Sequence, residues 1–403
     1  MTAGLRMLTI LLGMMMVAGA RARAHDGIPP YPAPLQTAWD AALMSAKPSL
    51  PRAAHGFLGK EYLKAARALV GPVTSNPARR GRQQGSPSSH EAKSEAAFNA
   101  WVLAAIGEGL HRKPWIEAAC DALDAATADL TDSANTSTDA GLSDLALCFA
   151  LSTVEPKASP GRHAHWNARM RAVPFPSAHQ PDEPVGTEAI AAAFLRREAG
   201  LVGTENSKAA LEVDDALAVW RTRFSPSGVC ESRARTPTAT SALDLETRLG
   251  LACILEEGYA GAHRYYFEEM LTRGARTTWL ELFERPGSGR GAKTDDSPLF
   301  QAALRCAVFE LRARGCIRSA EFEEARAMRA AAYESLATVR TTMKAAGPST
   351  DRTTRLRSAA VLAIAWQFAD KTDLHPASRF ESGKAHSVSQ GATHPATKPP
   401  RTR

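Results

Sequence analysis

The sequence predicts an all-α protein, and three observations support that fold class. Apolar residues recur at helical spacing over most of the chain, so that each segment has one apolar face. The alternation of apolar and polar residues that is typical of strands is almost absent, as are asparagine–glycine hairpin turns. Short connections between successive segments favour antiparallel helical hairpins. About a dozen helices arranged in hairpins predict either an α/α solenoid or a closed α/α toroid.

The first segment, 1–24, has the organisation of a cleaved secretory signal peptide. Arg6 precedes an apolar run over 7–18, and Ala-Arg-Ala follows at 22–24. Cleavage after residue 24 and cleavage after Ala20 both fit this pattern. The run is shorter than the roughly 20 residues that a membrane-spanning helix needs, and no second long apolar run follows it. We therefore expect an exported, soluble chain, periplasmic or secreted, with no transmembrane segment after cleavage.

Residues 25–372 form the predicted helical domain, which begins with a proline-rich lead-in over 25–34. Its clearest unit is a helical hairpin with apolar stripes over 98–110 and 116–130, and Pro114 occupies a position at the start of the second helix that needs no N–H donor. We expect Gly258, Gly274 and Gly315 to end the helices that precede them. The other predicted helices span 35–46, 57–70, 140–154, 186–199, 206–224, 241–258, 261–273, 276–284, 298–314, 319–345 and 352–370.

Three segments lack the apolar periodicity of a helix. The stretches 71–92 and 155–185 are rich in proline, serine, glycine and charge, and we expect both to be irregular loops. The last segment, 373–403, is rich in Ser, Thr, Pro, His and Lys and has little to bury, so that its composition predicts a disordered tail. The domain is thus expected to end near residue 372.

The charge distribution argues against nucleic-acid binding. The chain carries a formal net charge of +7, but three arginines in 1–24 and a net +3 in 373–403 account for most of it. The helical domain between these segments is therefore nearly neutral. A nucleic-acid-binding protein needs positive charge on the folded face that contacts phosphate. We expect no nucleic-acid partner.

Six cysteines lie in the mature chain, and their even number in an exported protein makes them candidates for disulfides. The alternative is that several are small apolar residues on buried helix faces. Cys306 and Cys316 cannot bond within one continuous helix, because ten residues separate them by about 15 Å. A bond between them would require a break near Gly315. The six disulfide candidates are Cys120, Cys148, Cys230, Cys253, Cys306 and Cys316.

His163 and His165 are the candidate metal ligands. In an extended segment, side chains two residues apart point the same way and could share a metal ion. No acidic residue or third histidine lies nearby in the sequence, and arginines flank the pair. The alternative is a surface segment with two unrelated histidines. No sequence motif indicates a bound cofactor.

The segment His263-Arg264-Tyr265-Tyr266 contains the densest group of reactive side chains. Polysaccharide lyases on α/α scaffolds use a basic Tyr or His to take a proton beside a sugar carboxylate, which an Arg neutralises. These four residues are therefore the candidate catalytic residues if the chain is an enzyme. The alternative is an ordinary helix start, with Tyr266 facing the core and His263 in solvent.

Three functions remain open on the sequence alone, and one of them, a structural component of a surface or a virion, has no sequence signal that separates it from protein binding. Stacked hairpins form a long concave surface, and no signature of a hydrolase, a nucleotide-binding enzyme or a zinc protease is present. The leading hypothesis is therefore an exported helical repeat-like protein that acts by binding or scaffolding a partner protein. The alternative is an α/α-toroid polysaccharide lyase or a related carbohydrate-active enzyme, whose partner would be an acidic polysaccharide.

Overall fold

The computed structural model describes residues 28–45, 57–71, 89–128, 140–172, 185–201, 209–230, 242–283, 297–346, 350–372 and 374. The predicted signal peptide, 1–24, lies outside these ranges, as do most of the predicted loop 71–92 and nearly all of the predicted tail 373–403.

The described residues are helical almost throughout and contain no β-strand, which confirms the all-α prediction. Phe224 and Cys230 make one isolated antiparallel bridge between α9 and α10. The helices are α2 (Ala33–Ser45), α3 (Gly59–Val70), α4 (Ser89–Gly109), α5 (Lys113–Thr127), α6 (Ala140–Val154), the 3₁₀ turn η4 (Glu155–Lys157), α7 (Pro160–Ala172), α8 (Thr187–Glu198), α9 (Ala209–Arg221), α10 (Ala242–Glu256), α11 (Arg264–Phe283), α12 (Pro298–Arg318), α13 (Phe322–Ala346) and α14 (Arg352–Phe368).

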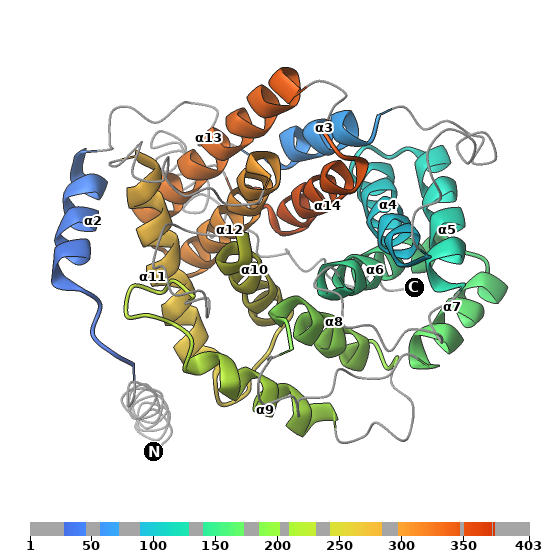
Figure 1. Ribbon diagram of the computed structural model, residues 1–403, viewed down its shortest axis with the longest axis horizontal. Coiled ribbons are helices and arrows are strands. Elements are labelled where there is room, and N and C mark those ends of the chain that lie inside the picture. The colour runs from blue at the N-terminus through green and yellow to red at the C-terminus, as the bar shows by residue number, and fades with distance from the viewer. Residues whose placement is uncertain are drawn as a thin grey trace, which may run out of the picture.

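Within the part of the chain that the structure describes, the even-numbered helices from α4 onward form a closed cycle of contacts (Figure 1). Along this cycle α4 packs on α6, α6 on α8, α8 on α10, α10 on α12, α12 on α14, and α14 on α4. We call these six the inner helices. The odd-numbered helices α3 to α13 lie outside them, and α2 lies farther out against α11 and α13. Trp101 of α4 donates from Nε1 to the carbonyl of Ala360 in α14 at 3.1 Å, which fixes the contact that closes the cycle.

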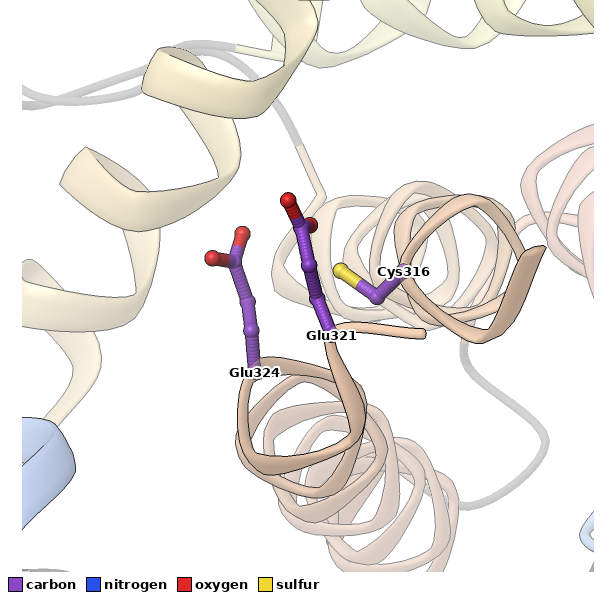
Figure 2. Close-up of side chains that lie close together, drawn as sticks. All are labelled: Cys316, Glu321 and Glu324. Carbon is purple, nitrogen blue, oxygen red and sulfur yellow. The ribbon is translucent and has the colours of Figure 1, made fainter. Parts of the chain in front are cut away.

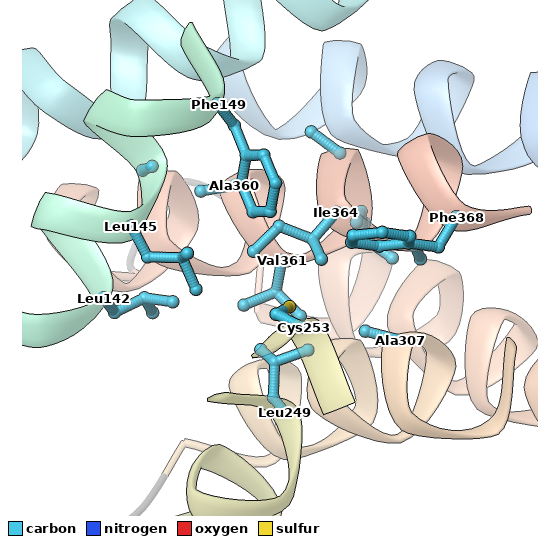
Figure 3. Close-up of a cluster of buried hydrophobic side chains, with 14 of the residues drawn as sticks. Leu142, Leu145, Phe149, Leu249, Cys253, Ala307, Ala360, Val361, Ile364 and Phe368 are labelled. Carbon is cyan, nitrogen blue, oxygen red and sulfur yellow. The ribbon is translucent and has the colours of Figure 1, made fainter. Parts of the chain in front are cut away.

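The space between the inner helices is filled by apolar side chains. Figure 3 shows Leu145 and Phe149 of α6 meeting Leu249 of α10 and Val361 and Ile364 of α14. All five are buried, and each fully buried side chain of this size contributes about 1.5–3 kcal/mol to folding. The core is therefore continuous across the cycle at this level.

Two of the expected helix ends are wrong. Residues 264–283 form the single helix α11, whereas the sequence predicted two helices separated at Gly274. A Cβ at Gly274 would lie 2.4 Å from the carbonyl oxygen of Gly228, so that the glycine serves close packing against the α9–α10 connection. Gly315 likewise lies inside α12. Gly258 does follow α10, with a positive φ of 98°.

The expectation of an irregular loop over 155–185 is wrong for its first half. Residues 155–157 form η4, and 160–172 form α7, which packs against α5. Only two residues of this helix, Trp166 and Met170, are buried. A helix that buries so few residues needs no continuous apolar stripe, so that the sequence did not reveal it. Trp166 donates from Nε1 to Asp124 Oδ1 at 2.7 Å, and this contact holds α7 in place.

The chain stays packed just beyond α14. Arg329 of α13 donates to the carbonyl oxygens of Asp370 and Thr372, each at 2.5 Å. Leu374 is buried with Cys316 and Ala325. The folded part therefore reaches slightly past the boundary expected at 372. None of the described helices is long and apolar enough to cross a membrane.

Candidate functional site

The four catalytic candidates of the sequence do not converge on one point. They lie at the start of α11, which is outside the inner helices (Figure 1). Arg264 pairs with Glu268, with Nε 2.8 Å from Oε1, and Tyr265 is 48% exposed. Tyr266 is buried and donates its hydroxyl to the carbonyl of Arg221 at 2.6 Å.

The protonation states of this group also differ from those that a tyrosine base needs. Burial raises the pKa of Tyr266, which disfavours the phenolate. Burial and the charge of Arg221 lower the pKa of His263, which favours the neutral imidazole. The arrangement matches the alternative expectation that Tyr266 packs into the core.

His163 and His165 lie within α7, so that the extended geometry required for a shared metal ion is absent. On a helix, side chains two residues apart leave the axis about 200° apart. Nε2 of His163 contacts the carboxylate of Glu155 and lies 2.6 Å from Nδ2 of Asn167. His165 is exposed on a different face.

The disulfide prediction is wrong, because all six cysteines are free and buried. Cys306 and Cys316 lie in the same unbroken helix, α12. Burial raises the pKa of Cys148 and of Cys230 to about 12 in each case, and these protonated thiols pack as small apolar groups. The alternative that the sequence offered for these residues is the one observed.

Among the described residues, one group of side chains has the spacing of a metal site. The ligand atoms of Cys316, Glu321 and Glu324 lie within 4.8 Å of one another (Figure 2). The carboxylate of Glu324 already binds two guanidinium groups, with Nη2 of Arg276 at 2.6 Å and Nη2 of Arg312 at 2.8 Å. Burial also raises the pKa of Cys316, which favours its protonated thiol. We interpret the group as an ion-pair network that joins α11, α12 and α13.

A second charged group lies where four inner helices begin, and we call it the helix-start cluster. It consists of Glu188 in α8, Glu246 in α10, Phe300 in α12 and Arg357 in α14, all within the first two turns of their helices. Nη2 of Arg357 donates to Oε1 of Glu246 at 2.7 Å. The Arg357 guanidinium also stacks on Phe300, with Cζ 4.2 Å from the ring centroid.

Helical periodicity places these charges beside the apolar core. Glu246 precedes Leu249 by three residues, and Arg357 precedes Val361 by four, so that each pair shares one helix face. Leu249 and Val361 belong to the apolar cluster between the inner helices (Figure 3). The inner faces of α10 and α14 therefore change from apolar to charged toward the helix starts.

Close packing brings Glu188 to the same place. The Thr187 hydroxyl donates to the carbonyl of Thr247 in α10 at 2.8 Å. A Cβ at Gly250 would lie 2.6 Å from the backbone nitrogen of Glu188, so that only glycine admits the start of α8 this close to α10. Burial raises the pKa of Glu188, and the charge of Arg357 and the Thr187 hydrogen bond oppose this shift.

The inner helix α4 joins α14 on the same end through Glu95. Its Oε2 lies 3.3 Å from Nε of Arg352, and its Oε1 accepts from the Thr353 hydroxyl at 3.0 Å. Asp351 caps α14 by accepting from the backbone N–H of Thr354 at 2.8 Å, which fixes the start of that helix. Carboxylates from three inner helices therefore lie around the first turns of α14.

The ion pair in this cluster is only partly withdrawn from solvent. Arg357 is 22% exposed and Glu246 is 18% exposed, so that both remain partly open to solvent. Burial raises the pKa of Glu188, which favours its protonated form and lets the group exchange a proton at a higher pH than an exposed glutamate. A carboxyl group with a raised pKa beside an ion-paired carboxylate is a recurring pattern in acid–base catalysis.

The sequence analysis missed Glu188, Glu246 and Arg357, although each leaves a trace in the sequence. Each is a charged residue on the apolar stripe of a helix that is otherwise largely apolar on that face. The sequence indicated His263–Tyr266 instead, because reactive side chains are grouped most densely in that segment. Comparison with protein-family models, with curated proteins and with solved structures gave no significant match to this chain. The chemistry of the site therefore rests on its own residues.

Proposed function

We propose that the chain is an exported α/α-toroid enzyme that cleaves an acidic polysaccharide by elimination, with the helix-start cluster as its active site. The observation that carries this proposal is the contact of Arg357 with Glu246, next to Glu188, at the common starts of the inner helices. The cycle of contacts among the inner helices supports the toroid. The choice of a polysaccharide rests on analogy with lyases on α/α scaffolds.

In the proposed reaction, Arg357 binds the carboxylate of a uronic acid unit and stabilises the negative charge that develops on it. The ionised carboxylate of Glu188 takes the proton from the carbon beside that carboxylate. The electron pair of the broken C–H bond forms a carbon–carbon double bond as the bond to the leaving sugar oxygen breaks. Glu188 then returns the proton to that oxygen, so that the products are an unsaturated sugar and a new chain end.

The raised pKa of Glu188 strengthens it as a base, because a base is most effective when its pKa is near the working pH. The reaction needs the ionised form of Glu188. Activity is therefore expected to rise with pH until the pH exceeds this raised pKa.

Protein binding stays a prediction from the sequence. It relied on the long concave surface of an open superhelix. The cycle of contacts among the inner helices favours a closed arrangement over an open one, so that this reason is weaker than the reason for an enzyme.

The test is the ultraviolet absorbance of unsaturated products when the purified chain is incubated with alginate and with glycosaminoglycans. Glu188→Gln should lower the rate about 10²–10⁴-fold, because it removes the proton-transferring group. Glu268→Gln makes the same chemical change on the outer face of α11 and should leave the rate unchanged, as should Tyr265→Phe.

Equal rates for Glu188→Gln and Glu268→Gln would contradict the assignment. New reducing ends without absorbance would replace elimination by hydrolysis, and no product from any acidic glycan would remove the proposal.

A further inference from the structure

A pocket of about 650 Å³ lies at the opposite end of α4 from the helix-start cluster. It forms where α4 ends and α5 begins, beside the connection from α6 to α7. Glu95 and Gly107 are twelve residues apart on α4, which corresponds to about 18 Å along the helix axis. The pocket is therefore separate from the proposed active site, and its volume is within the range of small-molecule sites.

Cations outnumber acids among the residues that line this pocket. Its walls include Arg112, Lys113, Lys157 and Arg162, together with the exposed His111, against the two glutamates Glu108 and Glu117. Buried apolar side chains from α5, Ile116 and Cys120, also line it. Such a pocket suits a small molecule with an anionic group and an uncharged body.

Two of the cations are held in position by neighbouring acids. Arg162 Nη2 lies 2.6 Å from Oδ1 of Asp121 and 2.8 Å from Oδ2 of Asp124. Lys157 forms an ion pair with Glu108. These pairs reduce the free charge on one side of the pocket but fix the direction of its cationic groups.

The other two cations, Arg112 and Lys113, lie where the chain turns from α4 into α5. Arg112 and Lys113 are exposed, and neither forms a salt bridge with another described residue. The backbone N–H of Arg112 donates to the carbonyl of Gly107 at 2.8 Å, and His111 adopts a left-handed φ of 53°. This geometry holds the two adjacent cations at the edge of the pocket, where their charges are available to a ligand.

We propose that this pocket binds a small organic oxyanion, with Arg112 and Lys113 as its principal charged contacts. The shared chemistry is one carboxylate or phosphate group attached to a sugar-sized uncharged body. A guanidinium and an ammonium side by side favour such a group through charge-assisted hydrogen bonds. The proposal does not depend on the activity assigned to the helix-start cluster.

Calorimetric titration of the full chain with glucuronate and with glucose 1-phosphate tests the proposal, with neutral glucose as the reference ligand. At least one of the two anions should bind, and glucose should not. The stronger binder identifies the carboxylate or the phosphate as the source of the charge. Failure of both anions to bind would overturn the proposal.

Paired variants then locate the binding. The double substitution Arg112→Gln and Lys113→Gln should weaken binding at least about tenfold, because it removes charged hydrogen bonds to the ligand. The control is Lys60→Gln with Lys371→Gln, which removes the same charge from exposed positions outside the pocket. An equal loss in both double variants would show a general effect of net charge and would overturn the assignment. Thermal unfolding of both variants confirms that each is folded.

Discussion

Two glutamate–arginine ion pairs in this protein differ in how much of their side-chain surface is exposed to solvent. Glu310 of α12 and Arg329 of α13 are both 0% exposed, and Arg329 also donates to the carbonyls of Asp370 and Thr372. The Tyr62 hydroxyl donates to Oε2 of Glu310 at 2.9 Å. The pair therefore joins α3, α12, α13 and the segment after α14 inside the protein.

Glu246 and Arg357 differ because they keep about a fifth of their side-chain surface exposed. Their surroundings include a third ionisable group, Glu188, whose pKa burial raises. A pair that is fully enclosed can contribute only to structure, whereas a partly open pair can exchange a partner for a ligand. Exposure, rather than the presence of an ion pair, distinguishes the candidate site from a structural contact.

The same substitution at both arginines should have the largest effect and should separate the two roles. Arg329→Met leaves Glu310 buried without its cation and should lower the free energy of unfolding by about 3–5 kcal/mol. Arg357→Met should lower it by only about 1–2 kcal/mol, because solvent reaches Glu246. Urea unfolding followed by circular dichroism measures both values. Equal losses at the two positions would show that Arg357 is as structural as Arg329.

Glu188 should give the protein a smaller, pH-dependent contribution. Its pKa is raised in the folded state above the ordinary value of 4.5, so that the folded chain retains a proton that the unfolded chain releases. The free energy of unfolding of the native chain, relative to Glu188→Gln, should therefore be highest at low pH. It should fall as the pH rises from about 4.5 through the raised pKa.

Glu61 supplies a control of the opposite sign. A hydrogen bond from Lys64 lowers the pKa of Glu61, so that its contribution is present above pH 4.5 and is lost as the pH falls through the lowered value. Urea titrations across this pH range compare Glu188→Gln and Glu61→Gln with the native chain. A difference between native and Glu188→Gln that stays constant with pH would contradict the buried environment of Glu188.

Reduction should have the smallest effect, because packing and ion pairs alone hold the described core. All six cysteines are free, so that a reducing agent should leave the thermal midpoint of unfolding unchanged. Alkylation of the denatured, unreduced chain followed by mass spectrometry should modify all six thiols. Fewer than six modifications would show that a disulfide forms in the protein.

Local sequence patterns predicted the helices well, whereas they gave no sign of which distant helices meet. The stripe over 98–110 follows α4 to one residue past its end at Gly109, and the second helix of that hairpin begins at Lys113, one residue before the expected Pro114. These features depend on residues three and four apart, which the sequence displays directly. The catalytic candidates at 263–266 stay a prediction, and the structure adds only that Arg264 binds Glu268 and Tyr266 binds the carbonyl of Arg221.

The sequence by itself determined that this chain is helical, because helical periodicity and the scarcity of strand patterns are local properties. Only the tertiary structure decided that α4 and α14 close the cycle, through a hydrogen bond between residues 259 positions apart. It likewise decided that Glu246 meets Arg357 across 111 positions. Such contacts depend on how whole helices pack, and packing selects partners by shape and burial, which no single segment of sequence specifies.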